Sequence, residues 1–290
     1  MKKWIVTLAV LSLLLAGCGA NKSAGTSGAA GHAGHSGHQE TPAAGPKQEE
    51  HAGHGAEAKT ELSTKAVWKL NPAQTQAGRE TAVSIQIQDD KGQPVEKFDL
   101  NHEKQLHLIA VSKDLSYFDH IHPEYKGKGV FEITTKLPAG GAYKLFADYV
   151  PTGGAATTKS EWIQVEGDAP AAKAPEPESK LTKVVDGKEV SLQIDGLAAG
   201  KEVMLTYRLS DAATKRPIDN LEPYLGAVGH VVILDEAAEQ YLHVHPMDEK
   251  AKGPEAEFMT TFPKSGVYKI WGQFQQAGKT FIVPFVVKVP

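Results

Sequence analysis

The chain has 290 residues and a formal net charge of −4 at pH 7, with 31 Lys and Arg residues against 35 Asp and Glu residues. Charges of both signs are interspersed without a basic block, which argues against nucleic acid as a partner. Cys18 is the only cysteine, so the sequence excludes disulfides and thiolate ligands from the folded part. Any metal site must therefore use nitrogen or oxygen ligands, with at most a thioether.

The N-terminal segment has the features of a bacterial lipoprotein signal. Lys2 and Lys3 precede an apolar run over residues 4–15 that is too short to span a bilayer. The run ends on small residues, as a secretory signal does, and the tetrad Leu15-Ala16-Gly17-Cys18 resembles a lipobox. We therefore predict a signal peptide over residues 1–17, lipidation of Cys18, and anchoring in the cell membrane at its extracytoplasmic face. The alternative is an uncleaved anchor that contains a cysteine.

Residues 18–60 predict a lipidated, disordered tether that is rich in histidine. The segment consists mainly of Gly, Ala, Ser, Glu and His, and it has too few large apolar side chains to offset the entropy of ordering. Histidine recurs every three residues in places, a spacing that suits weak, accessory capture of metal ions. These histidines are His32, His35, His38, His51 and His54. The alternative is a solvated spacer of biased composition.

The rest of the chain contains an internal duplication. Residues 61–168 and 181–290 are joined by a Pro/Ala-rich linker over residues 169–180, and equivalent positions lie 122 to 125 residues apart. For example, Tyr143-Lys144-Leu145-Phe146 matches Tyr268-Lys269-Ile270-Trp271. Short runs in both segments alternate apolar and polar residues and are separated by Pro, Gly and Asp, as in small β-sandwiches. We therefore predict an all-β protein with two tandem immunoglobulin-like β-sandwich domains after the tether.

Histidines occur at matched positions in the two repeats. Each repeat contains the pattern His-x12-His-x-His-Pro, formed by His107, His120 and His122 in the first repeat and by His230, His243 and His245 in the second. Only His102 stands apart from these sets and from the tether. In each repeat an apolar run follows the first histidine, and a second run ends on the other two, which is a hairpin pattern.

A four-residue turn at residues 113–116 or 236–239 would place the first histidine of each set opposite the third. Because strand side chains alternate between faces, all three imidazoles then share one face and can converge on a single ion, with metal–nitrogen bonds of about 2 Å. In the second repeat Val231 would face the core, and the histidine face also carries Val232, Leu234 and Tyr241. We therefore expect one metal site per repeat, in a shallow apolar groove.

Three imidazoles without a thiolate suit Cu(II) and Zn(II), and a blue-copper centre is excluded because its thiolate ligand is missing. We favour a copper ion over a zinc ion. Met247 follows the second His-x-His-Pro and could add a thioether ligand, whereas the first repeat has Glu124 there. Imidazole protonates near pH 6.5, so we expect the metal to be lost as the pH falls through about 6 to 5. The alternative is that the histidines make structural hydrogen bonds.

The segment Gly92-Gln93-Pro94-Val95 ahead of a strand and the later Gly-x-Tyr-x-Leu strand resemble the YtkA-like and FixH-like β-sandwich modules of bacterial envelopes. The two histidine hairpins are similar to segments of envelope copper-handling proteins. This resemblance implies an immunoglobulin-like fold and a metal-handling setting, and it identifies no reaction.

Together these observations predict an envelope lipoprotein, not an enzyme, that binds a transition metal for buffering, delivery or sensing. An envelope metal-transport protein is the expected partner. One alternative is a structural or adhesive cell-surface module whose histidines are structural. A second is a three-histidine zinc hydrolase, for which Glu124 and Asp248 are weak candidates as the general base.

Overall fold

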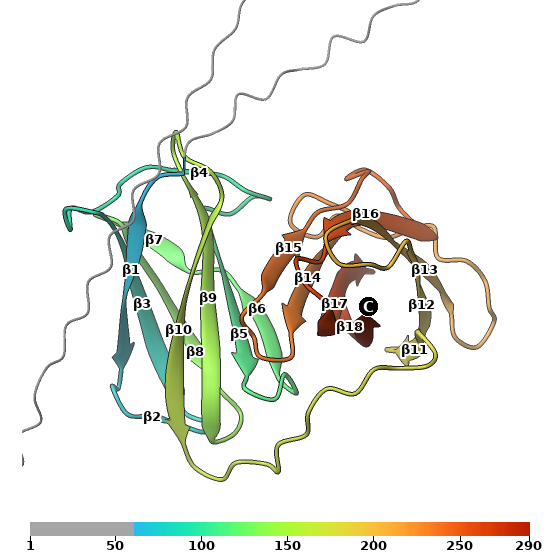
Figure 1. The fold of residues 1–290 in the computed structure, drawn as a ribbon, viewed down its shortest axis with the longest axis horizontal. Helices are drawn as coiled ribbons and strands as arrows, with labels where there is room; N and C mark the ends of the chain where they lie inside the picture. The colour runs from blue at the N-terminus through green and yellow to red at the C-terminus, as the bar shows by residue number, and fades with distance from the viewer. Residues whose placement is uncertain (1–60) are drawn as a thin grey trace, which may run out of the picture. The chain divides into compact units, whose positions relative to one another are not determined.

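The computed structural model describes residues 61–290. All regular elements in this part of the chain are β-strands, and they form two β-sandwiches, drawn in Figure 1 from blue to yellow-green and from yellow to dark red. This confirms the predicted fold class. The predicted signal peptide, the lipidation site Cys18 and the five tether histidines lie outside the described residues. From residue 61 onward, no helix is long and apolar enough to cross a membrane.

The first sandwich contains ten strands: β1 (Thr64–Asn71), β2 (Thr75–Gln76), β3 (Glu80–Asp89), β4 (Phe98–Asp99), β5 (Leu106–Ser112), β6 (Phe118–Ile121), β7 (Glu124–Gly127), β8 (Val130–Lys136), β9 (Gly141–Pro151) and β10 (Thr157–Glu166). One sheet has the order β1-β3-β8-β7 and the other β2-β10-β9-β5-β6, with β4 paired to β9. Strand β2 pairs with β10 in parallel, and the other pairs are antiparallel. Apolar side chains of both sheets, including Ile85 of β3 and Leu108 of β5, fill the core between them.

The second sandwich contains eight strands: β11 (Thr182–Val185), β12 (Lys188–Asp195), β13 (Glu202–Asp211), β14 (Gly229–Asp235), β15 (Tyr241–Val244), β16 (Glu255–Thr261), β17 (Gly266–Gln276) and β18 (Lys279–Val289). Its sheets have the orders β11-β12-β13-β16 and β15-β14-β17-β18, all antiparallel. The hairpin β14-β15 corresponds to β5-β6 of the first repeat, and β17 corresponds to β9.

The two histidine hairpins have the predicted register. Ile109 pairs with His120 across β5 and β6, and Val232 pairs with His243 across β14 and β15. Continued by one more pair, the same register sets His107 opposite His122 and His230 opposite His245. The turns close where expected, because the amide of Ser112 donates to Tyr117 O and that of Asp235 to Gln240 O. The predicted core face is also confirmed, since Val231, Ile233 and Val244 lie in the core of the second sandwich.

The opposite, histidine-bearing faces of the two hairpins pack against each other and form a third apolar cluster. Its members are Ile109, Val111, Leu115 and Phe146 from the first repeat and Val232, Leu234, Ala238 and Trp271 from the second, with Phe118 and Tyr241 packed against them. The prediction of a shallow apolar groove is therefore wrong. The same face is apolar in both repeats, so the two faces exclude water by covering one another, as the hydrophobic effect favours.

Contacts across this interface come in pairs that the duplication relates. The Phe118 ring stacks on Trp271 at 4.7 Å, and the equivalent Tyr241 ring stacks on Phe146 at 5.0 Å. Lys144 Nζ donates to Ala238 O at 2.7 Å, and Lys269 Nζ donates to Leu115 O at 2.7 Å. Each contact thus has a counterpart with the repeats exchanged, which is the pattern of an approximate two-fold interface.

Candidate metal centre

The six motif histidines gather at one end of the interface between the repeats. His107 on β5 and His230 on β14 are fully buried, and His120 on β6 is 7% exposed. The His107 ring lies 5.1 Å from that of His120 in its own hairpin and 5.0 Å from that of His243 in the other repeat. Histidines of different repeats are therefore as close as histidines of one hairpin.

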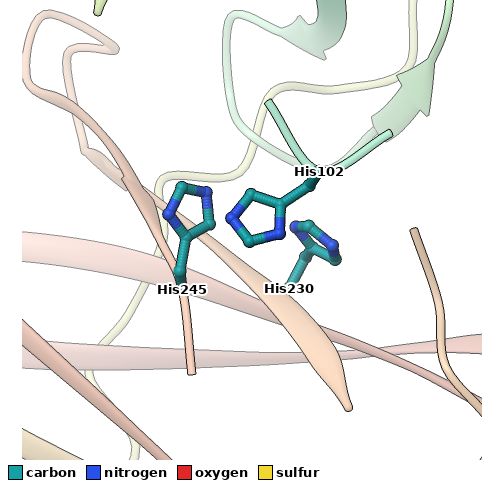
Figure 2. Close-up of side chains that lie close together, drawn as sticks. All are labelled: His102, His230 and His245. Carbon is teal, nitrogen blue, oxygen red and sulfur yellow. The ribbon is translucent and has the colours of Figure 1, made fainter. Parts of the chain in front are cut away.

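Within residues 61–290, two groups of three histidines have ligand atoms within 4.8 Å of one another. One consists of His107, His120 and His243, and the other of His102, His230 and His245. Each group takes residues from both repeats, so the grouping differs from the predicted set of three within each repeat. The cause is the packing of the two hairpin faces, which brings their histidines to the same place. His102, which lies outside the repeated histidine pattern, belongs to the second group (Figure 2).

In the first repeat, hydrogen bonds indicate which nitrogen of His107 and, with the Gln273 amide in its present orientation, of His120 carries the proton. His107 Nε2 lies 2.8 Å from Asn101 O, and a carbonyl only accepts, so Nε2–H donates and Nδ1 keeps a lone pair. His120 Nδ1 lies 3.1 Å from Gln273 Oε1 and donates in the same way. The two remaining lone pairs, on His107 Nδ1 and His120 Nε2, then face each other at 2.9 Å. A cation between them would bind both.

The second repeat repeats this arrangement. His230 Nε2 donates to Tyr224 O at 3.0 Å, and His243 Nδ1 donates to Asp148 Oδ2 at 2.7 Å. His230 Nδ1 and His243 Nε2 face each other at 3.4 Å. Histidines that bind metals commonly donate their other N–H to a carbonyl or carboxylate, which fixes the tautomer and aims the lone pair at the ion. Four imidazoles here have such partners.

Two of these partners, Asp148 and Gln273, were missed by the sequence reasoning. Asp148 on β9 and Gln273 on β17 are 5% and 2% exposed and occupy equivalent positions of the repeats. Each acts across the interface, because Asp148 bonds His243 of the second repeat and Gln273 bonds His120 of the first. A polar residue inside the apolar run of each strand, residues 145–150 in β9 and residues 270–274 in β17, was the available signal.

Burial also holds His107, His230 and His245 in the neutral, ligand-competent form. Desolvation, followed by the charge of His243, lowers the pKa of His107 to about 4 and that of His230 to about 2. The same two causes act on His245, whose pKa falls to about 3. The Nε2 atoms of His122 and His245 are buried without a hydrogen-bond partner. Buried imidazole nitrogens without a partner fit a cation site better than they fit an apolar packing role.

Other residues singled out from the sequence lie away from the two groups. Met247 is 58% exposed, so its thioether lies largely in solvent. Glu124 is exposed and pairs with Lys126 at 2.6 Å. Asp248 is exposed and accepts a hydrogen bond from the amide of Lys250. His122 packs 4.7 Å from His120 but belongs to neither group.

A surface cavity of about 540 Å³ reaches both groups. Its lining includes His243 of the first group and His245 of the second, together with Asn101, Asp148 and Tyr241. A small solute can therefore approach the buried cluster from this side.

Comparisons with known proteins bear mainly on the fold. A family model described as "Domain of unknown function (DUF8832)" matches residues 60–167 and 183–290, and no curated protein matches. Among solved structures, the Escherichia coli adhesin FdeC has 16% identity over 81% of this chain and 66% of its own, with a TM-score of 0.28. The Yersinia pseudotuberculosis adhesin InvE has 12% identity over 77% and 58%, with a TM-score of 0.24.

A two-domain fibronectin type III segment of chicken tenascin has 12% identity over 77% of this chain and 97% of its own, with a TM-score of 0.21. This chain thus spans less than two thirds of the InvE structure and nearly all of the tenascin segment. Likeness at these scores carries no functional argument.

Proposed function

The chain belongs to the DUF8832 family, which is defined by a domain of unknown function and matches both repeats, and we propose from the histidine geometry that the two repeats together bind a transition-metal ion. The proposal rests on one observation. Asn101, Gln273 and Asp148 accept from the outer nitrogens of His107, His120 and His243, so the inner nitrogens carry lone pairs. The ligand atoms of these three histidines converge within 4.8 Å.

A metal-free cluster can be satisfied only by changing this arrangement. Rotating the Gln273 amide would let its nitrogen donate to His120 Nδ1, and His120 Nε2 would then donate to His107 Nδ1. In the second repeat, a doubly protonated His243 would donate to both Asp148 and His230. The first change needs the Gln273 amide in the other orientation, and the second needs an imidazolium beside Asp148. A divalent cation satisfies the lone pairs without either change.

Copper is the favoured ion, with zinc second. Imidazole nitrogens bind both, and affinities of such sites for divalent ions rise to a maximum at Cu²⁺. The thioether argument for Cu⁺ is weakened because Met247 is largely exposed. We therefore propose Cu²⁺ as the ion held by His107, His120 and His243.

The biological setting that we propose is the bacterial envelope. A lipid anchor at Cys18 would hold the protein at the extracytoplasmic face of the cell membrane, and the tether histidines would capture ions weakly. The buried cluster would then buffer, deliver or sense the metal, with an envelope metal-transport protein as partner. The sequence resemblance to YtkA-like and FixH-like modules is the support for this setting.

The main rival is a structural or adhesive surface module with structural histidines. Two of the similar solved structures, FdeC and InvE, are adhesins, which fits this alternative, although their likeness is low. The zinc hydrolase reading is less well supported, since Glu124 and Asp248 are exposed and paired elsewhere. Metal binding separates the rival from the main proposal.

The test is a Cu²⁺ and Zn²⁺ titration of the full chain with the five tether histidines replaced by serine, here called the tether-silent chain. We expect stoichiometric binding that His120→Asn or His243→Asn each weakens by at least tenfold, because the first group takes ligands from both hairpins. The structural reading instead predicts no stoichiometric metal in any of these proteins.

A further inference from the structure

His102 lies in a turn of the first repeat, and its ring joins two histidines of the second repeat. The sequence pattern did not link His102 to either histidine hairpin. It precedes β5 in the turn formed by Asn101 and Lys104, and its backbone has φ 45°. Figure 2 shows its ring between those of His230 and His245, with its nitrogens turned toward both. The ring centroids lie 4.9 Å from His230 and 3.7 Å from His245.

The second repeat contains the same turn with a different residue at this position. Tyr224 and Ala227 form the equivalent bridge, and His230 donates to Tyr224 O as His107 donates to Asn101 O. The residue that corresponds to His102 is Leu225, with φ 52°. The counterpart of the group His102, His230 and His245 therefore has only two histidines. The approximate two-fold symmetry of the interface is broken at this point.

Each of the other two members of this group has a ring nitrogen that is available to bind a cation. His230 Nδ1 keeps its lone pair because Nε2–H donates to Tyr224 O. His245 Nε2 is buried without a hydrogen-bond partner. His102 supplies the third nitrogen, and the ligand atoms of all three lie within 4.8 Å of one another. Three neutral imidazoles of this kind suit a borderline divalent cation such as Cu²⁺ or Zn²⁺.

We infer that His102, His230 and His245 form a second metal site that exists on one side of the interface only. The inference rests on the proposed function, because it adds a second ion beside the one held by His107, His120 and His243. The two sites lie close together, and two dications repel, so the second ion binds more weakly than the first. His243 and His245 line the same cavity, which gives both ions access to solvent.

The sharpest variant is His102→Leu in the tether-silent chain. Leucine is the residue that the second repeat already holds at this position with a similar φ, so the turn accepts it. The matched control is Leu225→Ala, which changes the equivalent turn without replacing a ligand. Bound Cu²⁺ is counted by equilibrium dialysis, and electron paramagnetic resonance reports dipolar coupling between neighbouring Cu²⁺ ions.

We expect two ions with coupled spectra in the parent and in Leu225→Ala. His102→Leu should bind one ion, lose the coupling and change the affinity of the remaining ion less than about threefold. His245→Asn should have the same effect as His102→Leu. Two ions retained in His102→Leu, or one ion in both parent and variant, would overturn the second site while leaving the proposed function intact. No stoichiometric ion in the parent would instead overturn the proposed function, and the second site with it.

Discussion

Asp148 of the first sandwich accepts a hydrogen bond of 2.7 Å from Nδ1 of His243 in the second. The bond does two things at once. It fixes the tautomer of His243, because a carboxylate only accepts, and it joins the two repeats at a buried position. Tyr241 also approaches Asp148 Oδ2, at 3.4 Å. The orientation of a candidate ligand in one repeat therefore depends on a side chain of the other.

Asp148→Asn should lower the Cu²⁺ affinity of the tether-silent chain about 10- to 100-fold, the usual cost of losing a partner of a metal-binding histidine. An amide can donate to His243 Nδ1 and so favour the tautomer whose lone pair points away from the site. Isothermal competition titration measures the affinity. Asp119→Asn is the matched control, since Asp119 adjoins His120 on β6 and accepts from the Tyr117 hydroxyl and the His120 backbone amide, not from an imidazole. Equal loss in both variants would contradict the role given to Asp148.

Gln273→Glu should raise the Cu²⁺ affinity several-fold, whereas Gln273→Leu should lower it by tenfold or more. A carboxylate at this position only accepts from His120 Nδ1, as Asp148 does for His243, and its charge favours a nearby cation. Leucine removes the acceptor altogether. The comparison variant Gln164→Glu adds the same charge on β10, away from the cluster. If Gln273→Glu weakened binding as much as Gln273→Leu, the amide would be acting as a donor and the structural network would be the better description.

Much of the local architecture could be predicted from the sequence, and the reason is geometric. Side chains alternate along a strand, and the position of a short turn sets the register, so the pairings of His120 and His243 followed from spacing alone. The core face with Val231 and Ile233 followed from the same alternation. Both depend on residues that are near one another in the chain.

The composition of the metal groups could not be predicted, because it depends on which apolar faces cover each other. Val232 and Leu234 were recognised as apolar, but the pattern gave no sign that the partner surface was the same face of the other repeat. That packing brings His243 to His107. It also brings His102 to His230, through a turn whose conformation no periodicity describes.

The pKa shifts revise the expected acid sensitivity of the site. His107, His230 and His245 have folded pKa values of about 4, 2 and 3, below the unfolded value of 6.5. Of these three, His107 belongs to the first group, and proton competition at its imidazole begins near pH 4, so we expect Cu²⁺ to be retained at pH 5 rather than lost between pH 6 and 5. Dialysis at pH 7, 5 and 3.5 with circular dichroism as a check on folding measures this. Loss of the metal at pH 5.5 from folded protein would show that the site is less buried.

The same shifts make the metal-free protein sensitive to acid. Below pH 6.5 the unfolded chain binds protons on these histidines that the folded chain does not, so the free energy of unfolding decreases as the pH falls from 6.5 toward about 4. Chemical denaturation of the metal-free tether-silent chain at pH 7.5 and 5 should show lower stability at pH 5. His107→Gln should reduce the difference, because one such group is removed. A stability independent of pH over this range would contradict the burial of neutral imidazoles.

Trp271→Ala should loosen the interface between the repeats and thereby lower the Cu²⁺ affinity. The Trp271 ring is 3% exposed and stacks on Phe118 of the other repeat, so truncating it removes apolar contact between the sandwiches. Truncating a buried Trp costs about 3–5 kcal/mol, and here the loss loosens the contact that brings His243 to His107. We expect weaker Cu²⁺ binding and, by small-angle X-ray scattering, a larger radius of gyration in the metal-free state. Saturating Cu²⁺ should partly reverse both effects.

Val190→Ala, in the core of the second sandwich, is the control and should lower stability without a matching loss of affinity. Unchanged affinity in Trp271→Ala with a demonstrably loosened interface would mean that each repeat binds its ion alone.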